Sequence, residues 1–467
     1  MIELYLIFLP AVFAALIALS RKPVVIKILL AVAALLHLAG VIMLFNRLQE
    51  DAAALLPGWL EADFPGMIVV CIASALFCAV AIYTLFWLPA SRKFEIQYPT
   101  MSSHALCSVM CLFLSTMSLT AFAANFGLLW VAVEATTLAS APLIAFRRSR
   151  AALEAMWKYL VICSVGIGLA LLGTFMLGAA ARFSSQGFTD LSFRSFISIK
   201  EYLDPQYFKA AFLFCLAGYG LKMGLAPFHV WLPDAYSESP APVSVLLSGA
   251  LVNCSFLAIV RVTAAVPEKL QSFCSEYLIG LGILSLFVAA CFIIRQKDFK
   301  RMLAYSSVEH MGLMAIFWGL QMTDAALLHM IGHSACKMIL FFMAGNIFLV
   351  YGTKEYRYIS GMFSTMPLAA CIWLGGMLFI CGVPPSPLFT TEIMLIQKAG
   401  GVLGLLILLP LFVIFCGMTR TALEMTMGPA GEVPRKEAVP AGLRLSIIPA
   451  FLAFIPLAAG IYLIFQL

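Results

Sequence analysis

Residues 211–242, AFLFCLAGYGLKMGLAPFHVWLPDAYSESPAP, decide the fold of this chain. They begin as an apolar helix that carries Lys222, and Gly224 and Pro227 then interrupt that helix. A lysine at the centre of a bilayer costs roughly 2.5–3.5 kcal/mol even on lenient insertion scales. Irregular backbone at that depth persists only inside protein or beside a water-filled cavity. The stretch therefore predicts part of a transport route.

The composition is that of a membrane protein. The chain has 467 residues, of which 63% are hydrophobic and 11% are charged, whereas soluble domains carry about 25% charged residues. Its thirteen cysteines include no C-x-x-C pair, so we interpret them as core residues. The net charge of +6 is best interpreted through membrane topology. We therefore expect a lipid bilayer around the chain and no nucleic acid partner.

Apolar runs predict an all-α integral membrane fold. A bilayer core of about 30 Å needs about 20 apolar residues per helix. On this measure there are about fourteen transmembrane helices, at residues 2–20, 24–45, 64–88, 102–121, 122–146, 155–180, 208–230, 241–262, 274–295, 301–320, 323–351, 366–397, 401–424 and 443–466. The connection 182–207 is predicted to hold a short amphipathic helix at the membrane interface.

Basic residues predict the orientation. They gather in the loops that follow odd-numbered spans, which places both termini on the outer side of the membrane. The loop after the seventh span is an exception, because it carries Asp234 and Glu238 and no basic residue.

A second interrupted helix predicts an internal repeat. Residues 382–387, GVPPSP, break the twelfth span through Pro384, Pro385 and Pro387. The seventh and twelfth spans are five apart and run in opposite directions, which is typical of inverted repeats around a midplane site. We predict peripheral helices in 1–100, a first repeat in 101–263, a second repeat in 264–426, and a last loop and helix in 427–467.

Ionisable residues inside the predicted spans define a candidate proton pathway: Glu134, Lys158, Lys222, Glu309, His310, His329, His333, Lys337 and Glu392. Positions 329, 333 and 337 share one helix face, and histidine titrates near neutral pH. That face favours a proton relay. A metal site is the alternative, but the sequence places no third ligand nearby and Lys337 would repel a cation. We therefore expect no metal.

Several of these residues have a structural alternative. Glu134 can form a purely structural pair with a lysine, and Lys158 lies near a span end and can snorkel to the interface. Glu309 and His310 can serve at the membrane interface. Charge and helix break coincide at Lys222, so its functional interpretation is favoured.

These residues suggest a mechanism in which an ion pair alternately forms and separates. Glu134 and Lys222 are expected to stabilise each other as an ion pair. When the pair separates, Lys222 is expected to pass its proton to the groups of the tenth and eleventh spans. Glu392 would receive it near the other exit.

Four motifs resemble a known family: LLWVAVEATTL, GLKMGLAPFHVWLPDAYSESPAPVSVLLSG, QKDFKRMLAYSSVEHMG and GVPPSPLFTTEI. They are similar to the antiporter-like proton-pumping subunits of respiratory complex I, Mrp antiporters and membrane-bound hydrogenases, over about residues 100–400. The segments LEAMWKY, SSVEHMG and HSACKMILFFMAGN are most similar to the hydrogenase-4 component F type.

The resemblance implies roles for individual residues. Glu134, Lys222 and His310 match the glutamate of span 5, the lysine of span 7 and the histidine of span 10. Glu392 matches the terminal proton exit, and the span 11 polar positions are matched by His329, His333 and Lys337. One position departs from complex I: Asn253, eight residues before Arg261, stands where relatives often have Lys or His. An amide carries no excess proton, so water would have to bridge there or the route would differ.

The resemblance implies a proton-translocating subunit in a prokaryotic inner membrane. Its partners would be other antiporter-like and small membrane subunits and a peripheral redox arm, of group 4 NiFe-hydrogenase or formate hydrogenlyase type. The NiFe centre and Fe–S clusters would lie on those partners, because this chain has no Rossmann fingerprint, P-loop or cysteine cluster.

Three alternatives remain open. One is a Na⁺/H⁺ antiporter module of the Mrp type, and another is a structural anchor that does not conduct, which Asn253 supports. A membrane transferase that uses Asp234 and His229 is more distant, because the sequence around them has no nucleotide-binding feature.

Overall fold

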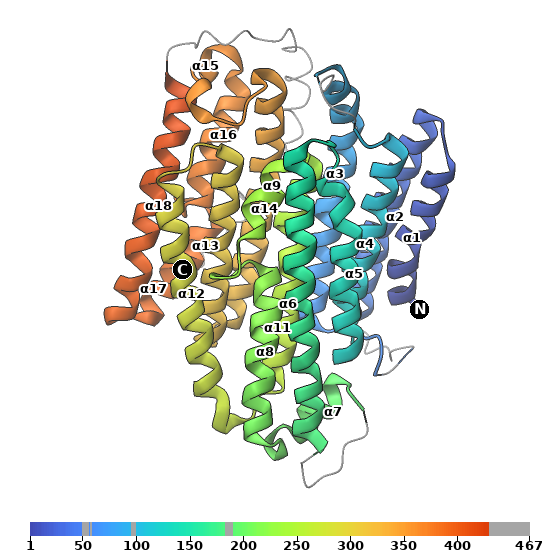
Figure 1. Ribbon diagram of the computed structural model, residues 1–467, viewed down its shortest axis with the longest axis vertical. Helices are drawn as coiled ribbons and strands as arrows, with labels where there is room; N and C mark the ends of the chain where they lie inside the picture. The colour runs from blue at the N-terminus through green and yellow to red at the C-terminus, as the bar shows by residue number, and fades with distance from the viewer. Residues whose placement is uncertain (49–55, 57, 95–99, 183–189, 429–467) are drawn as a thin grey trace. The chain divides into compact units, whose positions relative to one another are not determined.

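The computed structural model describes residues 1–48, 56, 58–94, 100–182 and 190–428. In these ranges every regular element is a helix, and the only extended pairings are isolated β-bridges (Figure 1). The predicted last span, 443–466, lies outside the described residues.

The α-helices follow one another along the chain: α1 (Ile2–Leu19), α2 (Pro23–Leu48), α3 (Phe64–Phe94), α4 (Ser103–Phe122), α5 (Phe126–Ile144), α6 (Arg150–Arg182), α7 (Phe193–Ile199), α8 (Pro205–Met223), α9 (Trp231–Glu238), α10 (Ala241–Leu246), α11 (Val252–Ala264), α12 (Gln271–Ile293), α13 (Phe299–Gly319), α14 (Thr323–Tyr351), α15 (Met362–Thr365), α16 (Pro367–Ile380), α17 (Pro387–Ala399) and α18 (Gly401–Met427). A π-helical turn, Leu247–Leu251, joins α10 to α11.

Ten helical segments in the described residues are long and apolar enough to cross a membrane. Large apolar side chains such as Phe8, Val161, Phe175, Leu405 and Phe412 stand exposed along them. Extended apolar surface of this kind is rare on soluble monomers and is expected where lipid covers the protein. The all-helical membrane fold is therefore confirmed, while the count of about fourteen spans stays a prediction.

Both predicted interruptions are present. The seventh predicted span, 208–230, is a helix only to Met223, because Gly224 turns left-handed with a φ of 95° and the cis peptide at Pro227 follows. The twelfth, 366–397, is divided into α16 and α17, with Pro384, cis Pro385 and Pro387 at the division. A further short helix, α7, lies in the connection where the sequence predicts an amphipathic one.

The described residues form two compact units. Unit 1 comprises residues 1–78, 101–231 and 250–278, and unit 2 comprises residues 79–100, 232–249 and 279–467 as far as these are described. The repeat boundaries predicted at 100, 263 and 426 stay predictions. Each unit is described by itself.

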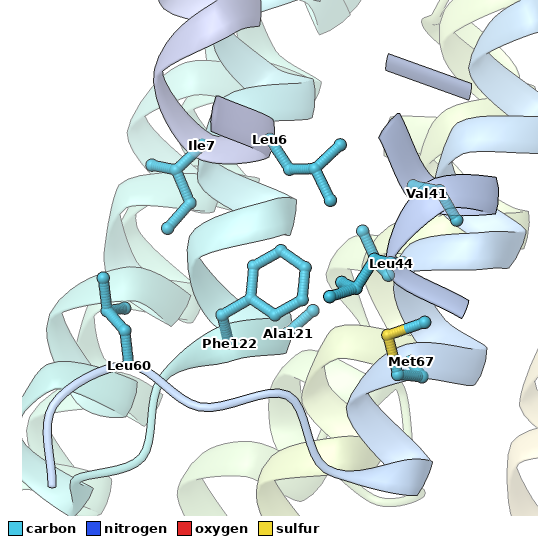
Figure 2. Close-up of a cluster of buried hydrophobic side chains, with 9 residues drawn as sticks. Leu6, Ile7, Val41, Leu44, Leu60, Met67, Ala121 and Phe122 are labelled. Carbon is cyan, nitrogen blue, oxygen red and sulfur yellow. The ribbon is translucent and has the colours of Figure 1, made fainter. Parts of the chain in front are cut away.

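In unit 1, α6 packs closely along α8 (Figure 1). Small residues make this possible, since a Cβ at Gly218 would lie 2.5 Å from the Gly166 carbonyl oxygen. Close backbone contact through small residues is a common way to join membrane helices. Figure 2 shows a second part of the core, where the Phe122 ring lies among Leu6, Leu44 and Ala121.

In unit 2, α14 is the central helix and packs against α10, α13, α16 and α17. Its apolar and polar residues alike are almost all buried, including both of its histidines and Lys337. The polar residues of α14 must therefore find partners on the helices around it.

Candidate functional site

In unit 1, the end of α8 holds Lys222, whose side chain is fully buried. The Gly224 N–H donates to the Gly220 and Leu221 carbonyls and closes the helix. The Leu221 carbonyl also accepts the indole N–H of Trp231 at 2.9 Å. Carbonyls at a helix end need such partners when water is absent. The interruption after Lys222 is thus stabilised from within the protein.

The Lys222 ammonium donates to three acceptors on α5: the Val133 carbonyl, Thr136 Oγ1 at 2.8 Å and Thr137 Oγ1 at 2.5 Å. An ammonium has three hydrogens, so each of them has an acceptor. All three acceptors are neutral. The charged form of Lys222 is therefore held by dipoles and has no direct counter-ion within ion-pair distance in the described residues.

Glu134 joins this group through one hydroxyl. Thr137 donates to Glu134 Oε2 at 3.1 Å, and Ser164 of α6 donates to Glu134 Oε1 at 3.0 Å. Thr137 therefore accepts a hydrogen from Lys222 and donates its own to Glu134. The direct Glu134–Lys222 pair expected from the sequence is replaced by a pair with a hydroxyl bridge, because Thr137 occupies the space between the two groups.

Lys158 lies on a more exposed face of unit 1. Its ammonium pairs with Glu154 at 2.6 Å on the same helix, and the two side chains are 44% and 64% exposed. This is the geometry of a pair on a helix surface, which fits the snorkelling alternative for Lys158 better than a place in a buried relay.

Asn253 lies near the start of α11 and is fully buried. The π-helical turn Leu247–Leu251 comes directly before it, and such turns are frequent at functional sites. Arg261, at the end of the same helix, pairs with Asp63 at 2.9 Å and donates to the Thr120 carbonyl at 2.7 Å. Arg261 therefore anchors α11, while Asn253 is a buried amide that can hydrogen-bond but not carry a charge.

In unit 2, His310 and His329 form a hydrogen-bonded row with Ile380 and Thr391 that joins four helices, α13, α14, α16 and α17. His310 Nε2 lies 3.1 Å from the Ile380 carbonyl oxygen, and His310 Nδ1 lies 3.0 Å from His329 Nε2. His329 Nδ1 lies 2.8 Å from Thr391 Oγ1. Both histidines are fully buried. Each of their four ring nitrogens has one hydrogen-bond partner within the protein.

The chemistry of these partners limits where the hydrogens lie. The Ile380 carbonyl only accepts, so His310 Nε2 carries a hydrogen. With neutral rings, His329 Nε2 donates to His310 and Thr391 donates to His329. With one more proton, the two histidine contacts reverse and Thr391 donates to the Leu388 carbonyl, 2.9 Å away. The row from Ile380 through His310 and His329 to Thr391 is fully hydrogen-bonded with or without an additional proton.

Lys337 lies on α14 and forms hydrogen bonds with residues of α13. Its ammonium donates to the Leu303 carbonyl at 2.5 Å and to the Ser306 hydroxyl. The third polar residue on this face, His333, has no hydrogen-bond partner for either ring nitrogen in the described residues, although its ring centre is 5.0 Å from that of His310. The predicted row of His329, His333 and Lys337 is therefore present, but its hydrogen bonds run to other helices and not along α14.

Two carboxyl groups of the predicted pathway, Glu309 and Glu392, are buried in unit 2. Glu309 is 2% exposed and its Oε2 has no hydrogen-bond partner in the described residues. Glu392 is 9% exposed and lies against the second helix break. A Cβ at Gly382 would come within 2.2 Å of Glu392 Oε2, so glycine is required there for this carboxyl to occupy its place.

The acids of α9 are neutralised by residues that are distant in sequence. Asp234 pairs with Arg301 at 2.6 Å, and Glu238 pairs with Lys354 at 2.7 Å. The Lys300 ammonium donates to the Ser239 carbonyl at 2.6 Å. The exceptional acidic loop is thus explained, because its bases come from α13 and from the loop after α14.

The sequence pattern did not single out the hydroxyl groups that link the charges: Thr136, Thr137, Ser164, Ser306 and Thr391. It also missed His37, a buried histidine of α2 that lies 3.0 Å from Ser74 Oγ and 3.0 Å from Ser118 Oγ. His37 could have been found as an ionisable residue in an apolar run. The hydroxyls could not, because Ser and Thr in helices usually bond to their own backbone.

Known proteins share the sequence and fold of this chain. Residues 123–419 match the family model described as NADH:quinone oxidoreductase/Mrp antiporter, TM. The chain is 35% identical over 355 residues to the "Hydrogenase-4 component F homolog" of Methylacidiphilum infernorum, a match that covers 74% of each chain.

Two solved structures have the same fold. A chain of the Mrp complex from Dietzia sp. DQ12-45-1b superimposes with a TM-score of 0.84 at 17% identity, over 98% of this chain and 94% of that one. A chain of respiratory complex I from Thermus thermophilus gives a TM-score of 0.77 at 22% identity, over 99% of this chain and 98% of that one.

Proposed function

Because the chain belongs to the NADH:quinone oxidoreductase/Mrp antiporter transmembrane family, we propose that it moves protons across a membrane as one subunit of a redox-driven complex. The observation that carries this proposal is the hydrogen-bonded connection from the buried Lys222 through Thr137 to the half-buried Glu134. A hydroxyl that accepts from an ammonium and donates to a carboxylate can relay a proton between them.

The similarity to a hydrogenase-4 component F homologue favours a NiFe-hydrogenase or formate hydrogenlyase type of complex. In this proposal the NiFe centre, the Fe–S clusters and the electron transfer belong to a peripheral arm. Small membrane subunits and other antiporter-like subunits lie beside this chain. The complex lies in a prokaryotic inner membrane, with both termini of this chain on the outer side.

A Na⁺/H⁺ antiporter module is the second candidate, and the shared fold with the Mrp complex supports it. Sodium prefers oxygen ligands, as hard cations do, whereas the buried groups of unit 2 include three imidazoles and an ammonium. Those groups favour protons as the transported ion.

The experiment reconstitutes the intact complex into vesicles and follows proton release with a pH-sensitive dye after the electron donor is added. We expect release that does not depend on sodium. Glu134→Gln removes the acceptor carboxylate and should reduce release to the level of empty vesicles, with subunit composition unchanged. Glu276→Gln, at an exposed glutamate of α12, is the matched control.

Each result has a definite meaning. Release that requires sodium would favour the antiporter module. Equal release from the Glu134→Gln complex and the wild-type complex would instead support a subunit that anchors the complex without conducting.

A further inference from the structure

The hydrogen-bonded histidines of unit 2 have a carboxylate beside them. One ring nitrogen each from His310 and His329 and one oxygen of Glu392 lie within 4.8 Å of one another, and all three residues are buried. They come from α13, α14 and α17. The sequence suggested His329 and His333 as the candidate pair and offered no third ligand. Folding instead joins His329 to His310 and brings in Glu392.

The outer contacts of the two rings suit metal ligation. His310 Nε2 donates to the Ile380 carbonyl and His329 Nδ1 contacts Thr391 Oγ1, while the nitrogens that face each other are 3.0 Å apart. Metal-bound histidines almost always donate their other N–H to such an acceptor. Thr391 can accept from His329 because its own hydrogen can go to the Leu388 carbonyl. Binding then needs only a change of tautomer at His329, and the two rings keep their number of protons.

The donor set selects the ion. Two imidazole nitrogens and one carboxylate form a common Zn²⁺ ligand set that leaves a position open for water. Sodium, magnesium and calcium prefer oxygen ligands throughout. The site therefore fits a divalent transition-metal ion, and its donors match zinc.

Charged and polar groups near the site would oppose or favour a bound cation. Lys337 would oppose a cation, but its ammonium is held on α13 by Leu303 and Ser306. Glu309 adjoins His310 in the chain and offers a buried carboxylate whose Oε2 has no partner in the described residues. His333 is fully buried, its ring nitrogens are unpartnered in the same ranges, and its ring centre is 5.0 Å from that of His310. The site thus has a second carboxyl group and a further imidazole in its surroundings.

We propose that His310, His329 and Glu392 bind Zn²⁺, and that the bound ion stops proton transfer through the two histidines. The ion would take the two nitrogens that otherwise share a hydrogen. Binding follows from the ligand geometry alone, whereas inhibition rests on the proposed function of the chain.

The test titrates the purified intact complex with Co²⁺, which replaces Zn²⁺ and gives visible absorption bands when protein-bound. We expect one band set that Zn²⁺ displaces and that His329→Gln and Glu392→Gln abolish. Thr391→Val removes only an outer contact and should weaken affinity about 10–100-fold. His37→Gln, at a buried histidine of unit 1, is the matched control and should bind as the wild type does.

The binding proposal is overturned if the Co²⁺ spectrum and affinity are the same in the wild type, Glu392→Gln and Thr391→Val complexes. Use of Thr391→Val keeps the test decisive where a ligand variant fails to assemble. Zn²⁺ is then added to vesicles that release protons. Binding at this site without loss of proton release would leave the metal site standing and contradict the proposed route through the histidines.

Discussion

Two fully buried lysines, Lys222 and Lys337, are held by the same kind of partner. Lys222 donates to the Val133 carbonyl and two threonine hydroxyls, and Lys337 donates to the Leu303 carbonyl and the Ser306 hydroxyl. Hydrogen bonds that involve a charged group contribute about 1.5–3 kcal/mol each, while burial of an ion costs several kcal/mol. The balance is close, so the loss of one hydroxyl is enough to change how readily a lysine keeps its proton.

Thr137→Val tests the hydroxyl bridge directly. Valine has nearly the shape of threonine and lacks the hydroxyl that joins Lys222 to Glu134. We expect assembly of the complex to be retained and proton release in vesicles to fall strongly. Thr137→Ser, which keeps the hydroxyl, should restore most of the rate.

Thr136→Val is the comparison for this prediction. Thr136 accepts from Lys222 at 2.8 Å but donates to the Val133 carbonyl, so it is not the bridge to Glu134. Its loss should reduce proton release less than the loss of Thr137. An equal effect of the two valine variants would contradict a bridge through Thr137.

At the scale of elements, apolar length was predicted well. The span predicted at 323–351 matches α14, Thr323–Tyr351. The ends of helices were harder to predict, because capping residues set them. For example, α8 begins at Pro205 after the Asp204 cap and ends at Met223, where Gly224 is the C-cap, so it is shifted from the predicted 208–230.

Gly224→Ala tests the first helix break. A residue with a Cβ in the left-handed conformation costs roughly 1–2 kcal/mol, and Gly224 has a φ of 95°. We expect a lower midpoint of thermal unfolding for the purified complex. Gly280→Ala in α12 is the control, because its Cβ would meet nothing within 4 Å. A Gly224→Ala complex as stable as the wild type would show that the break does not depend on this conformation.

At the scale of the whole molecule, each unit contains a fully buried lysine and carboxyl groups of the predicted pathway: Lys222 and the half-buried Glu134 in unit 1, and Lys337 with the buried Glu309 and Glu392 in unit 2. The sequence identified all of these residues, because an ionisable group in an apolar run is rare. It did not identify their partners. Contacts such as Asp234 with Arg301 join residues that are far apart in the chain, and spacing along one helix carries no information about them.

Lys222→Met offers the most direct test of the central claim, that this chain itself conducts protons. The variant removes the buried ammonium and keeps an apolar side chain of similar length, and Lys209→Met, at an exposed lysine of the same helix, is its control. Proton release is measured in vesicles that contain the fully assembled complex. We expect release to fall to background in Lys222→Met and to be unchanged in Lys209→Met. Release at the wild-type rate from an assembled Lys222→Met complex would contradict the claim.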